Sequence, residues 1–352
     1  MSGGRTSAFR LGRGPMAAAI LLQASCSSSS APTATAGTPL PSGSGWSVEA
    51  ITRVSSREGT PVVAGGLVWV PNMAEGSISA VNASDGRVER TVRIGDPGFL
   101  LRQGCGTSSV HATPHGSFDI RRCDVPNALA YDGKSLWVTL NDARVLLRLD
   151  PVSGRTLATI PLGIEAFGLG AGAAGVWVSD FEHDSVVHFD RSTGAVLATI
   201  SGMPPGPSGI AVGQDAVWVA CARANSIARI DPITNKVVAE LPLGKSPLPV
   251  AIAFGSVWVR SEEGDRLTRI DPATNRVVAT TVVGTAEGLD GLDQFGIDAT
   301  GLWLSGLRIA HVSAASNLQD RVLGYDGPAL DYGRGRLWAI GILGTLSRIR
   351  VN

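Results

Sequence analysis

The chain has 352 residues, enough for one large repeat domain or two ordinary domains, and its 30 Lys and Arg residues balance its 30 Asp and Glu residues. A formal net charge of zero does not supply the basic surface that binding to a phosphate backbone requires, so we expect no nucleic-acid partner. Glycine is abundant at 44 residues but lacks the three-residue period of collagen, which fits a chain with many tight turns.

Residues 1–26 have the features of a bacterial export signal. The apolar run at 16–22 is too short to span a bilayer, which needs about 20 residues. The segment ends at Cys26 and resembles the lipobox of bacterial lipoproteins, in which this cysteine is acylated and becomes the mature N-terminus. We therefore expect lipidation of Cys26, with plain secretion as the alternative. The basic start of the segment contains three arginines, Arg5, Arg10 and Arg13.

Residues 27–45 hold almost no bulky apolar side chain. Such a stretch cannot bury enough surface to offset its ordering entropy, so we expect a disordered Ser/Thr/Pro/Gly tether with a reach of about 25 Å. A tether directly after a cysteine agrees with the lipoprotein interpretation. The expected protein is a monomer outside the cytoplasm that contacts the membrane through a lipid anchor only, or alternatively a secreted protein.

One pattern recurs over residues 46–352 and is clearest over 207–244. That copy divides into four short strands that are rich in β-branched residues and bounded by Gly, Asn, Asp or Pro. Successive copies place a tryptophan in the second strand at spacings of 68, 40, 41, 40, 45 and 35 residues. A period near 40 with four strands is typical of a propeller blade, so the sequence predicts an all-β, seven-bladed β-propeller. Large aromatic residues at this position should pack between neighbouring blades. They are Trp69, Trp137, Trp177, Trp218, Trp258, Trp303 and Trp338.

The turn between the third and fourth strands keeps the same register from blade to blade. It reads DPITN over 231–235 and DPATN over 271–275. We expect the Asp to cap its own turn and the final Asn or Gly to adopt the positive φ that closes the loop. Related copies lie at 82–86, 150–154, 190–194 and 313–317.

These repeats resemble those of YVTN and NHL-type propellers, including the virginiamycin-B-lyase-like group, over residues 46–352. The resemblance implies a propeller fold. For the lyase group it also implies a histidine in a Pro-His-x-Ile stretch that enters the innermost strand, with acidic residues and a magnesium ion at the channel mouth. The residues that follow the matching prolines here are not histidine, so the acid–base constellation of that family is missing. They are Asn127, Ser208, Val250 and Ala329.

Blade seven lacks a fourth strand of its own, because the chain ends after a third strand at 346–351. The segment from Trp46 to Val54 precedes blade one and alternates apolar and polar residues, which is a strand pattern. We expect this N-terminal strand to complete blade seven, so that the ring closes between the two termini and leaves fewer exposed edges.

The loops after the second and fourth strands of a blade lie on one face of the ring, here called the variable face, and the DPxTN turns lie on the other, the turn face. The variable face holds an insertion at 96–125, an acidic crossover at 285–294, and a shortened loop between Trp303 and Ile309. Ligand sites commonly lie in irregular loops on a rigid frame, so we expect a site on this face.

The insertion contains two cysteines, Cys105 and Cys123. Exported cysteines favour disulfides, so we expect this pair to be bonded and the insertion to form a flap beside the mouth of the central channel. A metal site that uses His111, His115 and Asp119 is the alternative. Cys221 would then be a small buried thiol.

Three histidines lie in or near the strands of the blades. His188 and His311 fall where other blades have arginine, and we expect a solvated outer-strand surface there. His183 lies instead in a variable-face loop between carboxylates, where it is either a general base or a solvated loop residue. The weak catalytic candidates are His183, Asp180 and Glu182.

We expect a binding or scaffold module that presents its variable face to a protein, peptide or glycan at the cell surface. The alternatives are a metal-assisted lyase like the virginiamycin B lyases, or another channel-mouth enzyme such as a hydrolase. We expect no cofactor, and a divalent cation belongs to the enzyme alternatives. The expected ligand-binding residues are His115, Arg121, Arg122, Asp180, Glu182, Asp184, Arg223, Glu262, Glu263, Glu287 and Asp290.

Overall fold

The computed structural model describes residues 42–43, 45–54, 59–73, 75–95, 107–113, 116–121, 126–140, 143–261, 266–283, 295–306, 308–324, 329–341 and 344–352. Residues 40–352 form one compact unit. Within the described ranges every regular element is a β-strand, and no helix there is long and apolar enough to cross a membrane. The expected export signal, the acylation of Cys26 and most of the tether lie outside these ranges.

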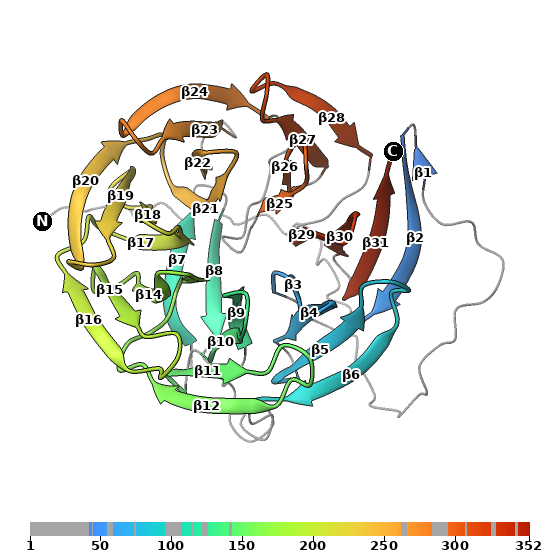
Figure 1. The fold of residues 1–352 in the computed structure, drawn as a ribbon, viewed down its shortest axis with the longest axis horizontal. Coiled ribbons are helices and arrows are strands. Elements are labelled where there is room, and N and C mark those ends of the chain that lie inside the picture. The colour runs from blue at the N-terminus through green and yellow to red at the C-terminus, as the bar shows by residue number, and fades with distance from the viewer. Residues whose placement is uncertain are drawn as a thin grey trace, which may run out of the picture. The chain divides into compact units, whose positions relative to one another are not determined.

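Seven antiparallel sheets stand around a ring and form a seven-bladed β-propeller, as the repeats predict (Figure 1). The first strand of each blade is innermost and the fourth is outermost (Figure 1). Blade one contains β3 (Val62–Ala64), β4 (Leu67–Asn72), β5 (Ser77–Asn82) and β6 (Val88–Arg93). Blade two contains β9 (Pro126–Tyr131), β10 (Leu136–Leu140), β11 (Val145–Leu149) and β12 (Thr156–Pro161). Blade three contains β13 (Leu169–Gly172), β14 (Gly175–Asp180), β15 (Ser185–Phe189) and β16 (Val196–Ser201).

The remaining blades follow the same order. Blade four contains β17 (Pro207–Val212), β18 (Val217–Cys221), β19 (Ser226–Asp231) and β20 (Lys236–Pro242). Blade five contains β21 (Pro247–Ala253), β22 (Ser256–Ser261), β23 (Arg266–Asp271) and β24 (Arg276–Val282). Blade six contains β25 (Phe295–Ile297), β26 (Gly301–Leu304), β27 (Ile309–Ser313) and β28 (Gln319–Leu323). Blade seven contains β29 (Ala329–Gly333), β30 (Arg336–Gly341), β31 (Thr345–Val351) and β2 (Trp46–Arg53), and β1 (Ser42–Gly43) pairs on the outside of β2.

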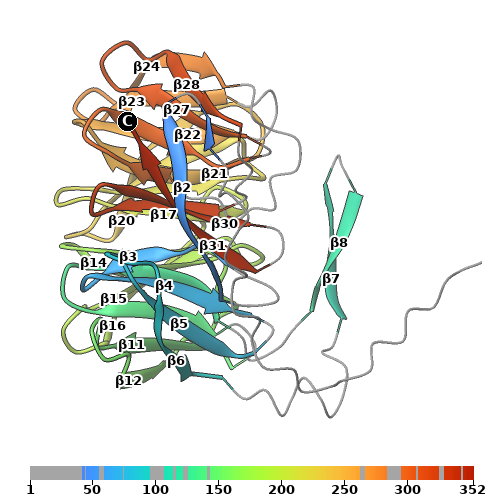
Figure 2. The ribbon, with the colours of Figure 1, turned by 90° about the vertical axis from the view of Figure 1, so that its right-hand side faces the viewer.

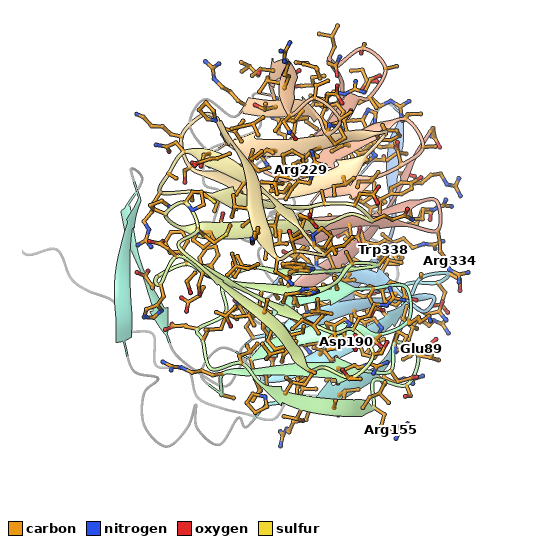
Figure 3. The ribbon with its side chains drawn as sticks, turned by 60° about the vertical axis from the view of Figure 1, so that its left-hand side comes forward. Glu89, Arg155, Asp190, Arg229, Arg334 and Trp338 are labelled. Atoms are coloured by element: carbon orange, nitrogen blue, oxygen red, sulfur yellow. The ribbon has the colours of Figure 1, made fainter. Side chains whose placement is uncertain are left out.

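The hydrophobic core is divided into layers between neighbouring blades. Each of the seven second-strand tryptophans is at most 1% exposed. Trp137 of blade two packs against Leu169 and Val178 of blade three, and Trp338 of blade seven packs in the same way against Val68 of blade one. Trp338 lies among the strands inside the ring (Figure 3). The predicted packing role of the tryptophans is therefore confirmed, because each one fills the space between two blades.

The turns between third and fourth strands form as the sequence predicts. Asp150 Oδ1 accepts hydrogen bonds from the backbone N of Ser153 at 2.7 Å and from its hydroxyl at 2.8 Å. These bonds, with the backbone bond first, hold the pKa of Asp150 below its ordinary value. Asn235 closes its turn with a φ of 55°, and Gly154 closes another with a φ of 73°. Glu89, Arg155 and Arg334 adjoin turns of three blades and lie on one side of the ring (Figure 3).

At the third-strand position opposite the tryptophan, the arginines of blades two, four and five each reach into the next blade. Arg229 extends its guanidinium beside Trp218 and donates to Pro272 O and to Asn275 Oδ1 in the turn of blade five. Arg269 makes the same two contacts with the turn of blade six, at Ala314 O and Asn317 Oδ1. The side chain therefore spans from its own tryptophan to the next blade.

The two histidines at this position are buried, so the expectation of a solvated surface there is wrong. His188 stacks on Trp177 at 3.8 Å between ring centroids, and its Nδ1 lies 2.7 Å from Asn235 Oδ1 in the turn of blade four. Burial lowers the pKa of His188. The residue type alone did not reveal this burial, because one of the groups around the imidazole, Asn235, comes from the neighbouring blade.

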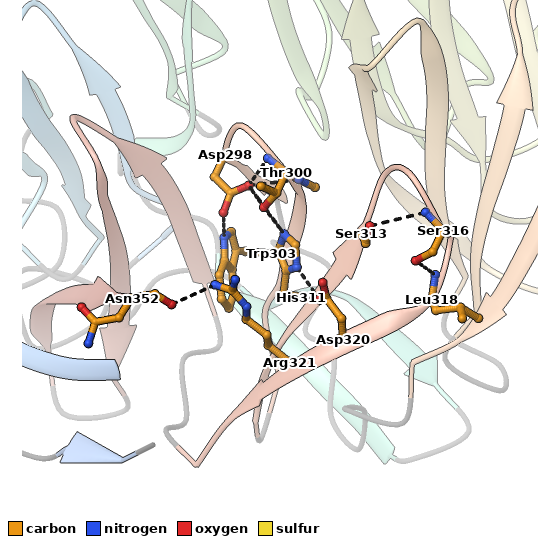
Figure 4. A network of polar contacts seen from close by, with 11 residues as sticks. Asp298, Thr300, Trp303, His311, Ser313, Ser316, Leu318, Asp320, Arg321 and Asn352 are labelled. Atoms are coloured by element: carbon orange, nitrogen blue, oxygen red, sulfur yellow. Dashed lines mark hydrogen bonds and ion pairs between the residues drawn. The ribbon is translucent and has the colours of Figure 1, made fainter. Parts of the chain in front are cut away.

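His311 is completely buried in blade six, between two carboxylates (Figure 4). Its Nδ1 lies 2.6 Å from Asp320 Oδ1, and its Nε2 lies 3.6 Å from Asp298 Oδ1. The other oxygen of Asp298 accepts a 2.7 Å hydrogen bond from Trp303 Nε1. His311 thus joins strand and turn within one blade, where His188 joins two blades.

The ring closes through the N-terminal strand, as predicted. β2 pairs antiparallel with β31, from Trp46 opposite Val351 to Arg53 opposite Thr345. Glu49 on β2 receives a bidentate contact from Arg336 of β30, with Nε to Oε2 at 2.6 Å and Nη2 to Oε1 at 3.0 Å. The Arg336 hydrogen bond is the largest of the causes that hold the pKa of Glu49 below its ordinary value.

The insertion at 96–125 contains a two-stranded antiparallel sheet of β7 (Thr107–Thr113) and β8 (Gly116–Arg121), drawn in Figure 2. The sequence did not predict these strands. Cys105 and Cys123 lie outside the described residues, so their disulfide stays a prediction. The side chains of His111, His115 and Asp119 also lie outside them. Cys221 is buried and unbonded, and burial raises the pKa of its thiol to about 12.

Candidate functional site

The loop between β14 and β15 places a histidine beside a buried carboxylate on the variable face. Asp180 ends β14, and its side chain is 2% exposed. Its Oδ1 accepts the backbone N of His183 at 3.2 Å, and its Oδ2 lies 2.9 Å from His183 Nδ1. The imidazole itself is 75% exposed. The buried carboxylate of Asp180 therefore holds the exposed imidazole of His183 in place.

The partner of the imidazole decides which of its nitrogens carries the proton. An ionised carboxylate only accepts hydrogen bonds, so His183 Nδ1 must donate to Asp180. In the neutral ring Nε2 is then an acceptor. Because His183 is mostly exposed, this nitrogen is available to take a proton from a molecule that docks on the loop.

Arg223, from the loop between β18 and β19 of blade four, crosses to the same loop of blade three. Its Nη2 lies 3.0 Å from Asp184 Oδ1 and its Nη1 lies 3.4 Å from Glu182 Oε2. It also donates to the backbone oxygen of Phe181. The loops of two blades are therefore held together by one guanidinium, whose charge is balanced by two carboxylates.

Two aromatic rings support this guanidinium. Arg223 Cζ lies 4.6 Å from the centroid of the Phe181 ring. Phe181 in turn stacks on Phe167, with ring centroids 4.7 Å apart. Phe167 precedes β13, so three loops of the variable face contribute to one layered stack. Cation–π contact restricts the arginine to one conformation without removing it from solvent.

Gly206, in the crossover from blade three to blade four, allows this crossover to lie close to the Arg223 loop. The backbone N of Gly206 donates to Asp184 Oδ1 at 2.8 Å. Gly206 has a φ of +72°, and an added Cβ would lie 2.8 Å from the backbone N of Arg223. A larger residue would push the Arg223 loop away, so the crossover into blade four needs glycine here.

The structure unites five of the predicted site residues in this cluster: Asp180, Glu182, His183, Asp184 and Arg223. The side chains of the remaining candidates lie outside the described residues, and so their grouping across the channel stays a prediction. These are His115, Arg121, Arg122, Glu262, Glu263, Glu287 and Asp290. The two phenylalanines were missed, although large aromatics in variable-face loops are an available signal.

The described carboxylates of the cluster do not fit a divalent cation. Glu182 and Asp184 face Arg223, and Asp180 faces His183. Throughout the described part of the chain, no three His, Cys, Asp or Glu side chains gather into a group that could hold a metal. The chemistry that this cluster offers is therefore proton transfer at His183 and recognition by charge and aromatic surface.

Comparison with family models finds no match for this chain, and comparison with curated proteins also finds none. Among solved structures, the chain resembles a structure of a streptogramin B lyase with a TM-score of 0.63. The likeness covers 86% of this chain and 98% of that chain, at 17% sequence identity. It shows the propeller fold. At this identity the site chemistry of the two proteins has to be argued separately.

Proposed function

We propose that this protein is a binding module that recognises a protein, peptide or glycan through the variable-face loops of blades three and four. The observation that carries the proposal is the fixed position of Arg223, which is held by two carboxylates and an aromatic stack while its side chain stays 41% exposed. Preorganised side chains on a rigid frame lose little freedom on binding, which favours affinity. Aromatic residues and arginine are also enriched at the energetic centres of interfaces.

The test is a selection of ligands from a peptide-display library and a glycan array with the full chain. Arg223→Ala should weaken the selected ligands by at least tenfold, since removal of an interface anchor costs more than about 1.4 kcal/mol. Ile233→Ala is the matched control, because Ile233 is 89% exposed on the turn face of the same blade. Ligands that bind both variants equally well, or a failure to select any ligand, would contradict the proposal.

A second candidate is an acid–base enzyme, and the Asp180–His183 pair is the observation that favours it. Asp180 would orient the ring while Nε2 removes a proton from the substrate. Streptogramin B is the first substrate to test, because the similar solved structure is a lyase of that name. Conversion of this substrate, followed by mass spectrometry, should be lost in His183→Gln. Equal activity of the variant, or an unchanged substrate with the unmodified chain, removes this candidate.

A further inference from the structure

A groove between blades seven and one lies apart from the loops of blades three and four. Its cavity is about 470 Å³, within the size range of sites for small ligands. Val54, which follows β2 of blade seven, forms one wall, and the ends of β4, β5 and β6 of blade one form the rest. The lining residues are Val54, Asn72, Glu75, Ser77, Thr91 and Arg93.

The carboxamide of Asn72 contacts two serine hydroxyls in this groove. Its Nδ2 donates to Ser77 Oγ and to Ser79 Oγ, both at 2.9 Å. The carboxamide oxygen is the end of the amide that these two hydrogen bonds leave free. Asn72 is 2% exposed, and its Oδ1 has no hydrogen-bond partner in the described part of the protein. Buried acceptors are normally paired, so we expect a donor group of a bound ligand to pair with this oxygen.

Arg93, at the end of β6, brings a positive charge to the same groove. It is exposed, and among the described residues it makes no salt bridge. A guanidinium recognises a carboxylate through two parallel hydrogen bonds. The Ser77 and Thr91 hydroxyls add neutral donors and acceptors between the two ends of the cavity.

An equivalent groove between blades four and five provides a comparison. It measures about 550 Å³, and Lys245 and Arg266 are part of its lining. Its counterpart of Asn72 is Ser261, whose buried Oγ also has no partner among the described residues. A hydroxyl rotates and both donates and accepts, whereas the carboxamide oxygen of Asn72 only accepts. Of these two grooves, the one between blades seven and one combines a buried carboxamide acceptor with an arginine from the outer strand.

We propose that the groove between blades seven and one binds a small carboxylate that also carries a hydroxyl or amino group on the neighbouring carbon. Arg93 pairs with the carboxylate, and the hydroxyl or ammonium group donates to Asn72 Oδ1. α-Hydroxy and α-amino acids share this chemistry. The site does not depend on the proposed function of the loops in blades three and four.

Calorimetric titration of the full chain with four probes tests the site. L-Serine and lactate carry both groups, propionate lacks the donor, and glucose lacks the carboxylate. Serine, lactate or both should bind with a stoichiometry of one, and propionate and glucose should bind at least tenfold more weakly. No binding of serine or lactate at millimolar concentration would overturn the proposal, as would equal binding of propionate.

Variants then locate the bound probe. Arg93→Gln should weaken binding at least tenfold, and Thr91→Trp, at an exposed position in the lining, should block the groove by bulk. Arg266→Gln is the matched control in the equivalent groove and should change the affinity less than twofold. Binding that survives both Arg93→Gln and Thr91→Trp, or that falls equally in Arg266→Gln, would place the probe elsewhere and overturn the proposal.

Discussion

Asp331 is a carboxylate at an inner-strand position where the other six blades have a small or apolar residue. Each of these residues pairs with the tryptophan of its own blade, and Asp331 pairs with Trp338. Its Oδ2 accepts the backbone N of Val63 in blade one at 2.8 Å, across the junction where the ring closes. Burial nevertheless raises the pKa of Asp331 to about 7. The residues of the other blades are Val62, Ala130, Gly170, Ala211, Ala251 and Gly296.

Because the pKa of Asp331 is raised, ionisation of this residue should lower the free energy of unfolding as the pH rises. The folded state holds the proton more tightly than the unfolded state, whose pKa is about 3.9. The carboxyl group therefore contributes its full stability below about pH 4 and loses it as pH rises through about 7. Three pKa units set an upper limit of about 4 kcal/mol, and solvent reaching this half-buried group reduces it.

Urea unfolding at pH 5 and pH 8 measures this effect. Asp331→Asn has no proton to lose, so the difference in unfolding free energy between it and the unmodified chain should change between the two pH values, in favour of the unmodified chain at pH 5. Titration of His188 and other groups is common to both proteins and cancels. A difference that is the same at pH 5 and pH 8 would mean that Asp331 does not titrate in this range.

The site residues show what sequence reasoning reaches and what it misses. Asp180 and His183 could be predicted as a pair, because they lie three residues apart in one loop. Arg223 could be predicted as a site residue, but its neutralisation of Glu182 and Asp184 could not, since those residues lie about 40 positions away and the approach depends on the angle between blades. In the described residues the carboxylates of this loop face Arg223 and His183.

Among the strands, β2 carries an electrostatic contact that joins it to the last two strands of the chain. Glu49 lies within 2.7 Å of Arg350 Nε and 3.5 Å of Arg348 Nη1, in addition to Arg336. Its side chain is 17% exposed, so solvent screens these contacts less than at an open surface. Loss of the carboxylate would leave three neighbouring arginines without their shared acceptor.

Glu49→Gln should lower the free energy of unfolding by on the order of 2 kcal/mol, because charged hydrogen bonds are lost and like charges remain. Glu89→Gln is the control, since the Glu89–Arg90 pair is about one-third exposed and such pairs contribute about 0–1 kcal/mol. The Glu49 contribution is present above the ordinary carboxyl pKa of about 4.3 and is lost as pH falls through the lowered value. Equal urea midpoints for the two variants at pH 7 would contradict this account.

At the scale of elements, features set by consecutive residues could be predicted, whereas contacts between blades could not. The DPxTN turns could be predicted because each is fixed by five consecutive residues. The third-strand arginines and histidines were aligned correctly, yet their contacts were missed because Arg229 and His188 reach a turn more than 40 residues away. The β7–β8 pair was missed because its segment lacks the repeat pattern that identified the other strands.

For the whole molecule, the repeat period and the strand count together predicted the ring and its closure. The tryptophan spacing determined the number of blades, and the absence of a fourth strand at the C-terminus left one place for residues 46–54. The pairing of β2 with β31 confirms this arrangement. In a ring closed in this way, β2 and the C-terminal strand β31 lie side by side in blade seven, so each stabilises the other.

Removal of the closing strand tests the closed ring most directly. The measurement compares the thermal unfolding of two truncated proteins, one without residues 46–54 and one without residues 27–41, a stretch that precedes every described strand. The first deletion exposes the edge of β31 and should lower the melting temperature by more than 10 °C or prevent folding, since it removes several kcal/mol of pairing and burial. The second should leave the melting temperature within about 2 °C of the full chain. Equal melting temperatures for the two truncated proteins would contradict closure of the propeller by its N-terminal strand.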